Sequence, residues 1–416
     1  MTRLSVGHSV DLTIEKPAAG GRMIARVDGQ VVLVSGTIPG ERVTACIERI
    51  GKGVVYAETS EVLDPSPDRR EPFTDCACGG LLYAHIEYAR QLEIKSTVIA
   101  DAFGRIGRLP LVAAVPVAAS PEQGYRMRAR LHVRDGQAGF FREGTHALCD
   151  ARATRQLLPA TCDAVEEVAA RLRALGTSGV SEIEVSENVD ATERAMHVER
   201  ETGTALVLTS DPQLARLTER QSVTDRLSIL GHDVELGRHV LAFFQSNRYL
   251  LEPLVACVVD RLEPGGTALD LYAGVGVFAL GAAACKGAHV TAVEGDRVSA
   301  SDLRDNADRA DQADRANGAG SVRAVHEAVE SFLATTRERP DVVVVDPPRT
   351  GMSREAMDGV LRVRSTRIVY VSCDVATLAR DARRLVDGAG YTLAAVNAFD
   401  LFPNTPHVEI VAVFDR

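Results

Sequence analysis

ALDLYAGVGVFAL, residues 268–280, is the stretch that decides the fold. It begins as an apolar run that carries the acid Asp270, turns at Gly274 and Gly276, and reads as helical from Val277. Glycine lets the backbone approach a ligand closely. A strand, a glycine turn and a helix in this order are typical of one unit of a parallel α/β sheet.

Further apolar runs follow the same scheme along residues 236–416. Residues 289–294 form the next predicted strand, and residues 342–345 and 368–371 are fully apolar and β-branched or aromatic. Each run precedes helical sequence, which is the pattern of a parallel sheet covered on both faces. We therefore expect a Rossmann-like α/β domain over residues 236–416.

Two other domains are predicted before it. Residues 1–62 consist of short strands and turns, including a hairpin turn at Asp28-Gly29, which suits a small OB-like β-barrel. Residues 70–235 mix helices with strands, so we expect an α+β domain. Its predicted elements are helices at 88–104 and 158–175, a hairpin about Asp135-Gly136, and strands at 183–185 and 205–208.

The charge distribution leaves two interpretations open. The net charge of −10 by itself speaks against a nucleic-acid partner. Residues 124–155, however, hold seven arginines against three acids. Arg126, Arg128 and Arg130 alternate, so on a strand they would share one face. That face is either a solvated strand surface or a stripe that contacts RNA phosphates.

The chain shows no membrane or export signal. No apolar run approaches the roughly 18–20 residues of a membrane span, and residues 1–10 do not read as a signal peptide. We therefore expect a cytoplasmic protein. In that reducing compartment the eight cysteines are not expected to form disulfides, so each is a buried filler, a ligand or a nucleophile.

The glycine turn predicts a nucleotide-like cofactor. Glu294 ends the strand after the turn, where an acid can accept hydrogen bonds from ribose hydroxyls. A dinucleotide and S-adenosylmethionine both suit such a turn, and Ala279 at the third glycine position is compatible with either. Asp270 favours S-adenosylmethionine, because that cofactor carries a cationic ammonium and no pyrophosphate.

Asp346 and Cys373 are predicted to lie at the same edge of the sheet, and Glu409 is an available carboxylate. Asp346, stiffened by Pro347 and Pro348, follows one apolar strand, and Cys373 follows the next. Glu409 stands at the start of the last apolar strand, an odd place for a surface charge. Methylation of uracil at C5 needs such a set. A thiolate adds to C6, an acid stabilises the enolate, and a base removes the C5 proton.

These motifs together resemble the RNA uridine-5 methyltransferases. The resemblance rests on residues 243–247 (FFQSN), the glycine turn, residues 346–349 (DPPR), residues 372–373 (SC), residues 377–381 (TLARD) and the stretch from 402 to 409. It implies a class I methyltransferase that uses S-adenosylmethionine and modifies rRNA or tRNA, most simply as a monomer. It also implies that Gln245, Tyr272, Glu294 and Asp346 contact the cofactor or the base, that Cys373 is the nucleophile and that Glu409 is the base. Residues 28–41 and 62–69 resemble a TRAM domain, which implies RNA binding.

The sequence departs from the family pattern in two places. Asp374-Val375 replaces the usual Asn-Pro after the nucleophile, and an extra carboxylate there should raise the pKa of Cys373. Many relatives also hold an iron–sulfur cluster with four cysteines. Here Leu81 and Pro72 stand at two of those positions, and Cys76, Cys78 and Cys149 remain. We expect no iron–sulfur cluster and no other metal, although zinc with His85 as a fourth ligand is an alternative.

Three other functions remain as alternatives. An RNA cytosine-5 methyltransferase also uses a cysteine nucleophile, but enzymes of that kind normally place it elsewhere. A non-catalytic RNA-binding protein would use the barrel and the arginines alone. A nicotinamide-dependent dehydrogenase would use the glycine turn for a dinucleotide.

Overall fold

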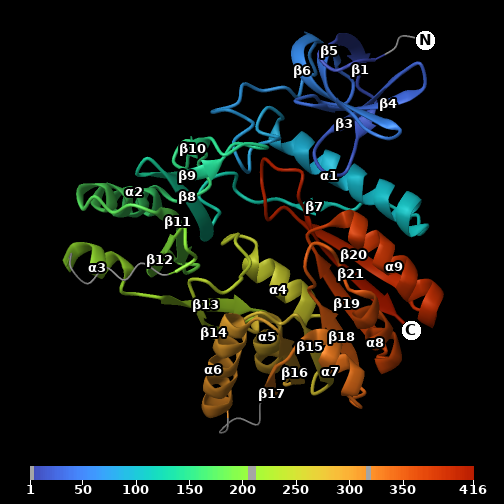
Figure 1. The fold of residues 1–416 in the computed structure, drawn as a ribbon. Coiled ribbons are helices and arrows are strands. Elements are labelled where there is room, and N and C mark those ends of the chain that lie inside the picture. The colour runs from blue at the N-terminus through green and yellow to red at the C-terminus, as the bar shows by residue number, and fades with distance from the viewer. Residues whose placement is uncertain (1–3, 205–211, 315–319) are drawn as a thin grey trace.

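The structure is a computed structural model that describes residues 4–204, 212–314 and 320–416. Figure 1 shows a small all-β unit, a central unit with its own sheet, and a C-terminal sheet flanked by helices. Within the described ranges, no helix is both long enough and apolar enough to cross a membrane.

The N-terminal unit is a six-stranded sheet in the order β1-β5-β6-β4-β3-β2. Strand β1 also contacts β3, so the sheet curls into a small barrel around an aliphatic core. The predicted Asp28-Gly29 turn joins β3 to β4, and both residues have positive φ (47° and 84°), as a tight two-residue hairpin requires. The strands are β1 (Ser9–Thr13), β2 (Lys16–Pro17), β3 (Met23–Val27), β4 (Gln30–Ser35), β5 (Arg42–Ile50) and β6 (Val54–Asp64).

The central unit is an antiparallel sheet in the order β10-β9-β8-β11-β12. Helix α2 (Pro159–Ala174) packs on one face of it, where alternate residues of β8 such as Leu131 are buried. The hairpin predicted about Asp135-Gly136 is present, whereas the strand predicted at 205–208 lies outside the described residues. The elements are β8 (Arg128–Arg134), β9 (Gln137–Phe141), β10 (Leu148–Asp150), β11 (Val180–Glu187), β12 (Arg194–Arg200) and α3 (Pro212–Thr218).

The C-terminal sheet has the order β17-β16-β15-β18-β19-β21-β20-β7. The strands from β17 to β19 in this order are parallel, and β21 runs antiparallel between β19 and β20. The predicted apolar strands are all present. The strands are β15 (Thr267–Leu271), β16 (His289–Glu294), β17 (Ser321–His326), β18 (Val342–Val345), β19 (Arg367–Ser372), β20 (Thr392–Phe399) and β21 (Glu409–Asp415). The helices are α4 (Leu251–Val259), α5 (Val277–Lys286), α6 (Arg297–Asp314), α7 (Val329–Thr335), α8 (Arg354–Val363) and α9 (Val375–Ala389).

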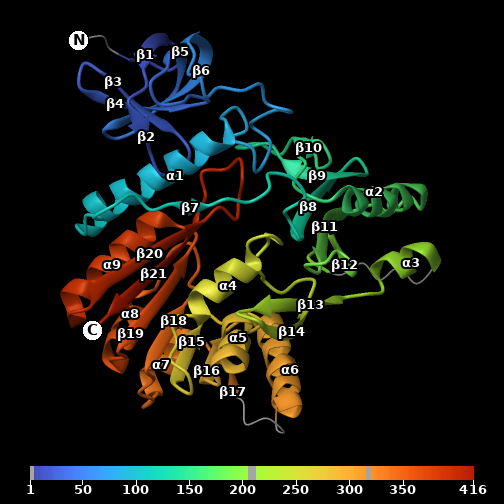
Figure 2. The ribbon, with the colours of Figure 1, turned by 180° about the vertical axis from the view of Figure 1, so that it is seen from behind.

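Two segments outside residues 236–416 also pack on this sheet. Helix α1 (Tyr88–Ala102) lies between the barrel and α9 (Figures 1 and 2). It buries Ile94 in the barrel core and Ile99 in the core beside α9, and β7 (Val117–Ala118) extends the sheet next to β20. The hairpin of β13 (Ser222–Ile229) and β14 (His232–His239) packs on α4, α5 and α6. In the structure, parts of residues 70–235 therefore pack with the C-terminal unit, although the predicted boundary at 235 places them in the central domain.

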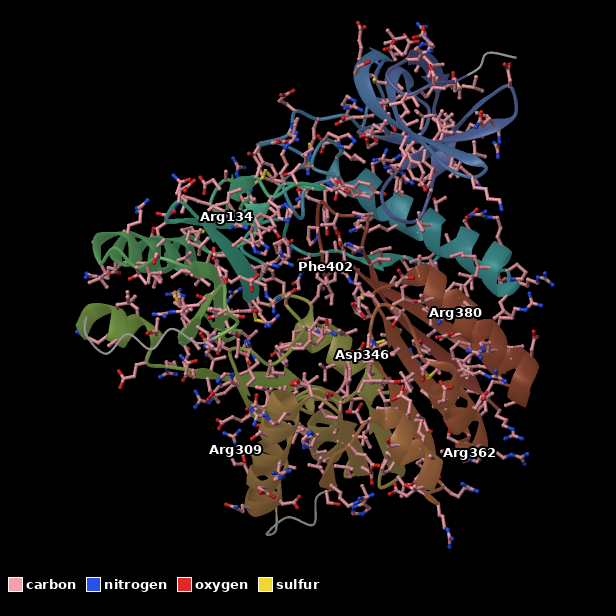
Figure 3. The ribbon with its side chains drawn as sticks, viewed as in Figure 1. Arg134, Arg309, Asp346, Arg362, Arg380 and Phe402 are labelled. Carbon is pink, nitrogen blue, oxygen red and sulfur yellow. A yellow bond between two sulfur atoms is a disulfide. The ribbon has the colours of Figure 1, made fainter. Side chains whose placement is uncertain are left out.

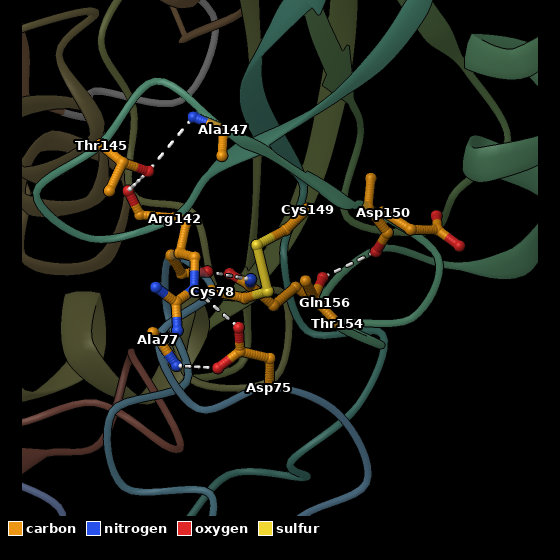
Figure 4. Close-up of a disulfide and its surroundings, with 12 residues drawn as sticks. Asp75, Ala77, Cys78, Arg142, Thr145, Ala147, Cys149, Asp150, Thr154 and Gln156 are labelled. Carbon is orange, nitrogen blue, oxygen red and sulfur yellow. Dashed lines mark hydrogen bonds and ion pairs between the residues drawn. A yellow bond between two sulfur atoms is a disulfide. The ribbon is translucent and has the colours of Figure 1, made fainter.

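Cys78 and Cys149 form a disulfide, with Cα atoms 5.7 Å apart (Figure 4). The expectation that no cysteine is disulfide-bonded is thus wrong for this pair. Backbone hydrogen bonds hold residues 77–79 against residues 141–143, from Gly79 N–H to Phe141 O and from Glu143 N–H to Ala77 O, and this places Cys78 beside β10. A four-thiolate cluster does not fit these residues, because two of the three candidate thiolates are bonded to each other and Leu81 packs beside them.

Candidate active site

The predicted site residues meet at the carboxyl edge of the C-terminal sheet, where open α/β sheets bind ligands. Tyr272 follows β15, Asp346 follows β18 and Cys373 follows β19. Glu294 is the last residue of β16. Glu409 opens the antiparallel strand β21, which places it at the same edge. Figure 3 shows Asp346 near the middle of the molecule, where the three units face one another.

The glycine turn is built for a close approach. Tyr272 has a positive φ of 61°, which side chains other than glycine rarely adopt, and such strain is typical of functional loops. Gly274 donates its backbone N–H to Glu294 Oε2 at 2.7 Å. Gly276 has a φ of 95°, and a Cβ there would lie 2.5 Å from Leu303 Cδ1, so any other residue would be strained at this position. Asn306, which the sequence did not single out, supports the turn by donating to Val275 O at 2.9 Å.

Asp270 is a buried carboxyl group with no cationic partner among the described residues. It is 1% exposed, and neither oxygen has a hydrogen bond of good geometry within the described residues, apart from a weak contact with the Ala279 amide. Burial, followed by repulsion from Asp346, raises its pKa well above the usual value. Buried polar atoms in native proteins normally have partners. A cationic ligand group would supply one, so this residue fits the ammonium of S-adenosylmethionine.

Asp346 and Gln245 contact each other across the site. Gln245 Nε2 donates to Asp346 Oδ2 at 3.2 Å, and Gln245 is itself only 7% exposed. Burial raises the pKa of Asp346 to about 7, although the Gln245 hydrogen bond acts in the opposite direction and Glu294 adds a further rise. Gln245, which only the family resemblance identified, is therefore brought to the predicted acid.

Cys373 is a half-buried thiol at the start of α9. Burial and then the nearby Glu409 raise its pKa to about 11, while Arg349 lowers it by charge and by a hydrogen bond. The expected rise is therefore present, but its largest causes are not Asp374. Asp374 instead caps α9, because its Oδ1 accepts the Thr377 N–H at 2.8 Å.

Glu409 is 2% exposed, and its Oε1 has no partner among the residues described. Burial is the largest cause that raises its pKa well above the usual value, with Asp346 adding to it and Arg349 opposing it. The charges in this site therefore affect one another's pKa values. Glu409 and Asp346 raise the pKa of Cys373, and Arg349 lowers the pKa values of Cys373 and Glu409. An acid, a thiol and an arginine within one partly buried site can support covalent catalysis.

The loop between β20 and Glu409 is held by residues from the N-terminal half, which sequence reasoning missed. Lys95 Nζ of α1 contacts Asp400 Oδ1 at 2.5 Å, and both side chains are at most 1% exposed. Asn404 Oδ1 accepts from Gln91 Nε2 at 3.0 Å and from Arg70 at 2.9 Å. Burial lowers the pKa of His407, next in this loop, to about 4, so its ring is neutral at pH 7. Figure 3 shows Phe402 of this loop between the central unit and α1.

The predicted arginine stripe is on one face of the central sheet but is partly neutralised. Arg128 and Arg130 both contact Glu184, at 3.2 and 2.6 Å, and the Arg128 side chain is only 19% exposed. Arg126 lies just before β8 and donates to Gln156 Oε1 at 2.7 Å. The backbone of Arg126 also forms an isolated antiparallel β-bridge with Asn247, which is two residues after Gln245. The stripe therefore begins beside the site.

Comparison with known proteins agrees with this geometry. A family model for tRNA (uracil-5-)-methyltransferase matches residues 198–416, and one for the TRAM domain matches residues 3–59. The 23S rRNA (uracil(1939)-C(5))-methyltransferase RlmD of Alkalilimnicola ehrlichii is 32% identical, covering 95% of this chain and 94% of its own. An uncharacterized RNA methyltransferase of Streptomyces coelicolor is 32% identical over 99% of this chain and 93% of its own.

A solved structure has the same overall fold. The Pyrococcus abyssi tRNA (uracil-54, C5)-methyltransferase in complex with S-adenosyl-L-homocysteine aligns with a TM-score of 0.74 at 22% identity, covering 97% of this chain and 99% of that chain. The fold and the site together define a class I methyltransferase with an N-terminal TRAM domain. More specifically, the chain belongs to the RNA uracil-5 methyltransferase family, whose methyl donor is S-adenosylmethionine. The predicted family, fold class and cofactor are confirmed, and the dehydrogenase alternative is wrong.

Proposed function

We propose that this enzyme methylates C5 of a uridine in rRNA or tRNA through a covalent bond between Cys373 and C6 of the base. The observation that carries the proposal is the convergence at one sheet edge of the half-buried Cys373 thiol, the buried Glu409, whose Oε1 has no partner among the described residues, and Asp346. A cytosine-5 methyltransferase would also need the thiol, but the family match favours uracil.

Cys373, Glu409 and Arg349 each act at a different step of the reaction. The Cys373 thiolate adds to C6, and the electron pair of the C5–C6 bond moves toward C5 and O4 to give an enolate. C5 then takes the methyl group that bound S-adenosylmethionine would supply, and S-adenosylhomocysteine would remain as the leaving group. Glu409 removes the C5 proton, the electron pair reforms the C5–C6 double bond, and the Cys373–C6 bond breaks to return the thiolate. Arg349 favours the thiolate, because its charge and hydrogen bond lower the pKa of Cys373.

The cofactor would be held by the glycine turn and the acids around it. S-adenosylmethionine supplies the methyl group when bound. Asp270 fits its cationic ammonium, and Glu294, whose oxygens each accept one backbone N–H at 2.7 Å, retains lone pairs for the ribose hydroxyls. Tyr272, Gly274 and Gly276 shape the turn, and Gln245 orients Asp346.

RNA contact is assigned to the barrel and to part of the arginine stripe. Arg126 begins the stripe beside the site, and the Arg130 side chain is 57% exposed despite its contact with Glu184. Arg130 is therefore available to phosphates, and we assign Arg126 to the same role because of its place beside the site, whereas Arg128 is mostly enclosed. An rRNA or tRNA substrate supports a cytoplasmic location. We also propose that the enzyme acts as a monomer.

A mechanism-based trap tests the proposal. RNA that contains 5-fluorouridine has no C5 proton to lose, so the reaction should stop after methyl transfer with the RNA still bonded to the protein. Unfractionated rRNA and tRNA transcripts that carry 5-fluorouridine would be incubated with enzyme and S-adenosylmethionine and resolved on denaturing gels. A slow-migrating adduct is expected with the wild type and not with Cys373→Ala. An adduct that survives Cys373→Ala would remove Cys373 from its role, and no adduct with the wild type would refute the proposal.

A further inference from the structure

A stacked pair of aromatic rings lies on the central sheet, apart from the site described above. The His132 and Phe141 ring centroids are 3.6 Å apart with the planes inclined by 4°, and His146 meets Phe141 edge-on with centroids 5.3 Å apart. His132 pairs across β8 and β9 with Gly139, which has no side chain, so Phe141 two residues on can reach over to the His132 ring.

This pair is not part of the hydrophobic core. Side chains alternate along β8, and Leu131 and Val133 point to the face that α2 covers. His132 and Phe141 lie on the opposite face and are only partly buried, and neither belongs to the core cluster beneath α2. Partly exposed aromatic rings on a sheet are the surfaces on which single-stranded RNA-binding modules stack bases. His132 and Phe141 cover one face of each other, so a base would stack on the outer face of one of the two rings.

The surroundings of the pair suit a polyanion. Arg130 and Arg134 flank His132 along β8 on the same face, and Arg130 is 57% exposed although it contacts Glu184. Arg134 is exposed and has no ion pair in the part of the chain that the structure describes. Glu182 contacts His132 at 3.2 Å, yet burial lowers the pKa of His132, so its ring is a neutral aromatic surface at pH 7.

The same strand connects the pair to the active site. Arg126 bridges to Asn247 next to the site, and His132 lies six residues further on, about 20 Å along an extended strand. We propose that His132 and Phe141 form a stacking platform for an unpaired base of the substrate RNA, several nucleotides from the methylated uridine. This inference rests on the proposed RNA substrate and adds a second site at which the protein contacts that RNA.

The absence of tryptophan from the sequence allows a direct test. Phe141→Trp introduces a single tryptophan whose emission a stacked base would quench. The probe is single-stranded oligoadenylate of about 12 nucleotides, within the usual range for such surfaces, with an A–U duplex of the same length as the comparison. Quenching is expected with the single strand and not with the duplex. Leu175→Trp is the matched control, because Leu175 is 44% exposed at the end of α2 on the other side of the sheet, and its emission should not change.

Affinity measurements on the same oligonucleotide complete the test. By anisotropy of labelled oligoadenylate, Phe141→Ala should weaken binding by about 5- to 150-fold, and Phe141→Tyr should restore it. Equal affinity of Phe141→Ala and the wild type, unquenched emission despite binding, or no binding by the wild type would each overturn the platform. The 5-fluorouridine adduct at Cys373 should still form with Phe141→Ala at saturating RNA. That adduct separates failure of the platform from failure of the proposed function.

Discussion

The buried ion pair between Lys95 and Asp400 offers a sharp test of how the active-site loop is held. Lys95 Nζ also donates to Phe402 O at 3.2 Å, and burial lowers the pKa of Lys95 while Asp400 opposes that shift. Lys95→Met would leave Asp400 buried without its counter-charge. Removing one partner of such a pair costs about 3–5 kcal/mol. For a domain of this size that corresponds to a fall in Tm of roughly 6–20 °C.

Calorimetry of three variants would measure this effect. Lys95→Met should show the full fall, and the double variant Lys95→Met with Asp400→Leu should recover most of it, because no buried charge is then left alone. Lys286→Met is the control, since its partner Asp260 is 62% exposed and surface pairs contribute about 0–1 kcal/mol. A fall for Lys95→Met no larger than that of the control, or a double variant less stable than Lys95→Met, would refute the reasoning.

Four further outcomes follow from the site. Glu409→Gln should lower turnover by about 10²- to 10⁴-fold and leave methylated RNA bonded to Cys373 on a denaturing gel; turnover near the wild-type rate would mean that another group is the base. Only about one Cys373 thiol in ten thousand is ionised at pH 7 when the pKa is about 11, so single-turnover methylation should rise with pH. Arg349→Ala should shift that profile to higher pH, with Arg349→Lys between the two, and superimposable profiles would contradict the role of Arg349. Asp346, with a pKa of about 7, loses its charge as pH falls, so calorimetric affinity for S-adenosylmethionine should weaken from pH 8 to pH 6. S-adenosylhomocysteine lacks the sulfonium charge and should weaken less; equal losses would count against Asp346. Arg126→Ala and Arg130→Ala should each reduce the salt slope of RNA binding by about one unit, whereas the enclosed Arg128 should not; unchanged slopes would leave the stripe a solvated strand face.

The strands that build the site were predictable because each has a clear signal in its own short stretch of sequence. Residues 342–345 form a run of four valines, which is typical of a buried strand. The two glycines that follow Asp270, at 274 and 276, are typical of a strand-to-helix turn that binds a ligand. The carboxyl ends of parallel strands share one edge, so the proximity of Asp346 and Cys373 followed from strand order alone.

Contacts between distant segments were not predictable in this way. Lys95 and Asp400 are 305 positions apart, and no local pattern links them. Glu184 neutralises part of the arginine stripe from a strand 54 positions after Arg130, and the Cys78–Cys149 disulfide depends on a backbone pairing of two loops. Helix α1 was predicted as a helix, but its role as a bridge between the barrel and the C-terminal sheet depends on which neighbours its two ends meet.

The features that cost this fold stability are concentrated where the chemistry is proposed. Tyr272 adopts a strained φ, and among the described residues Asp270 has no counter-charge and one oxygen of Glu409 has no partner. Each departs from the favourable backbone geometry or the polar pairing that is usual in a folded protein, and such departures are expected at functional sites. Asp346 also raises the pKa values of Asp270 and Glu409, and Glu294 adds to the rise at Asp270, because like charges in a buried site repel. A site of this kind is costly when empty and favourable when a cation enters. The same carboxylates that weaken the empty fold therefore provide the attraction that a cationic methyl donor requires.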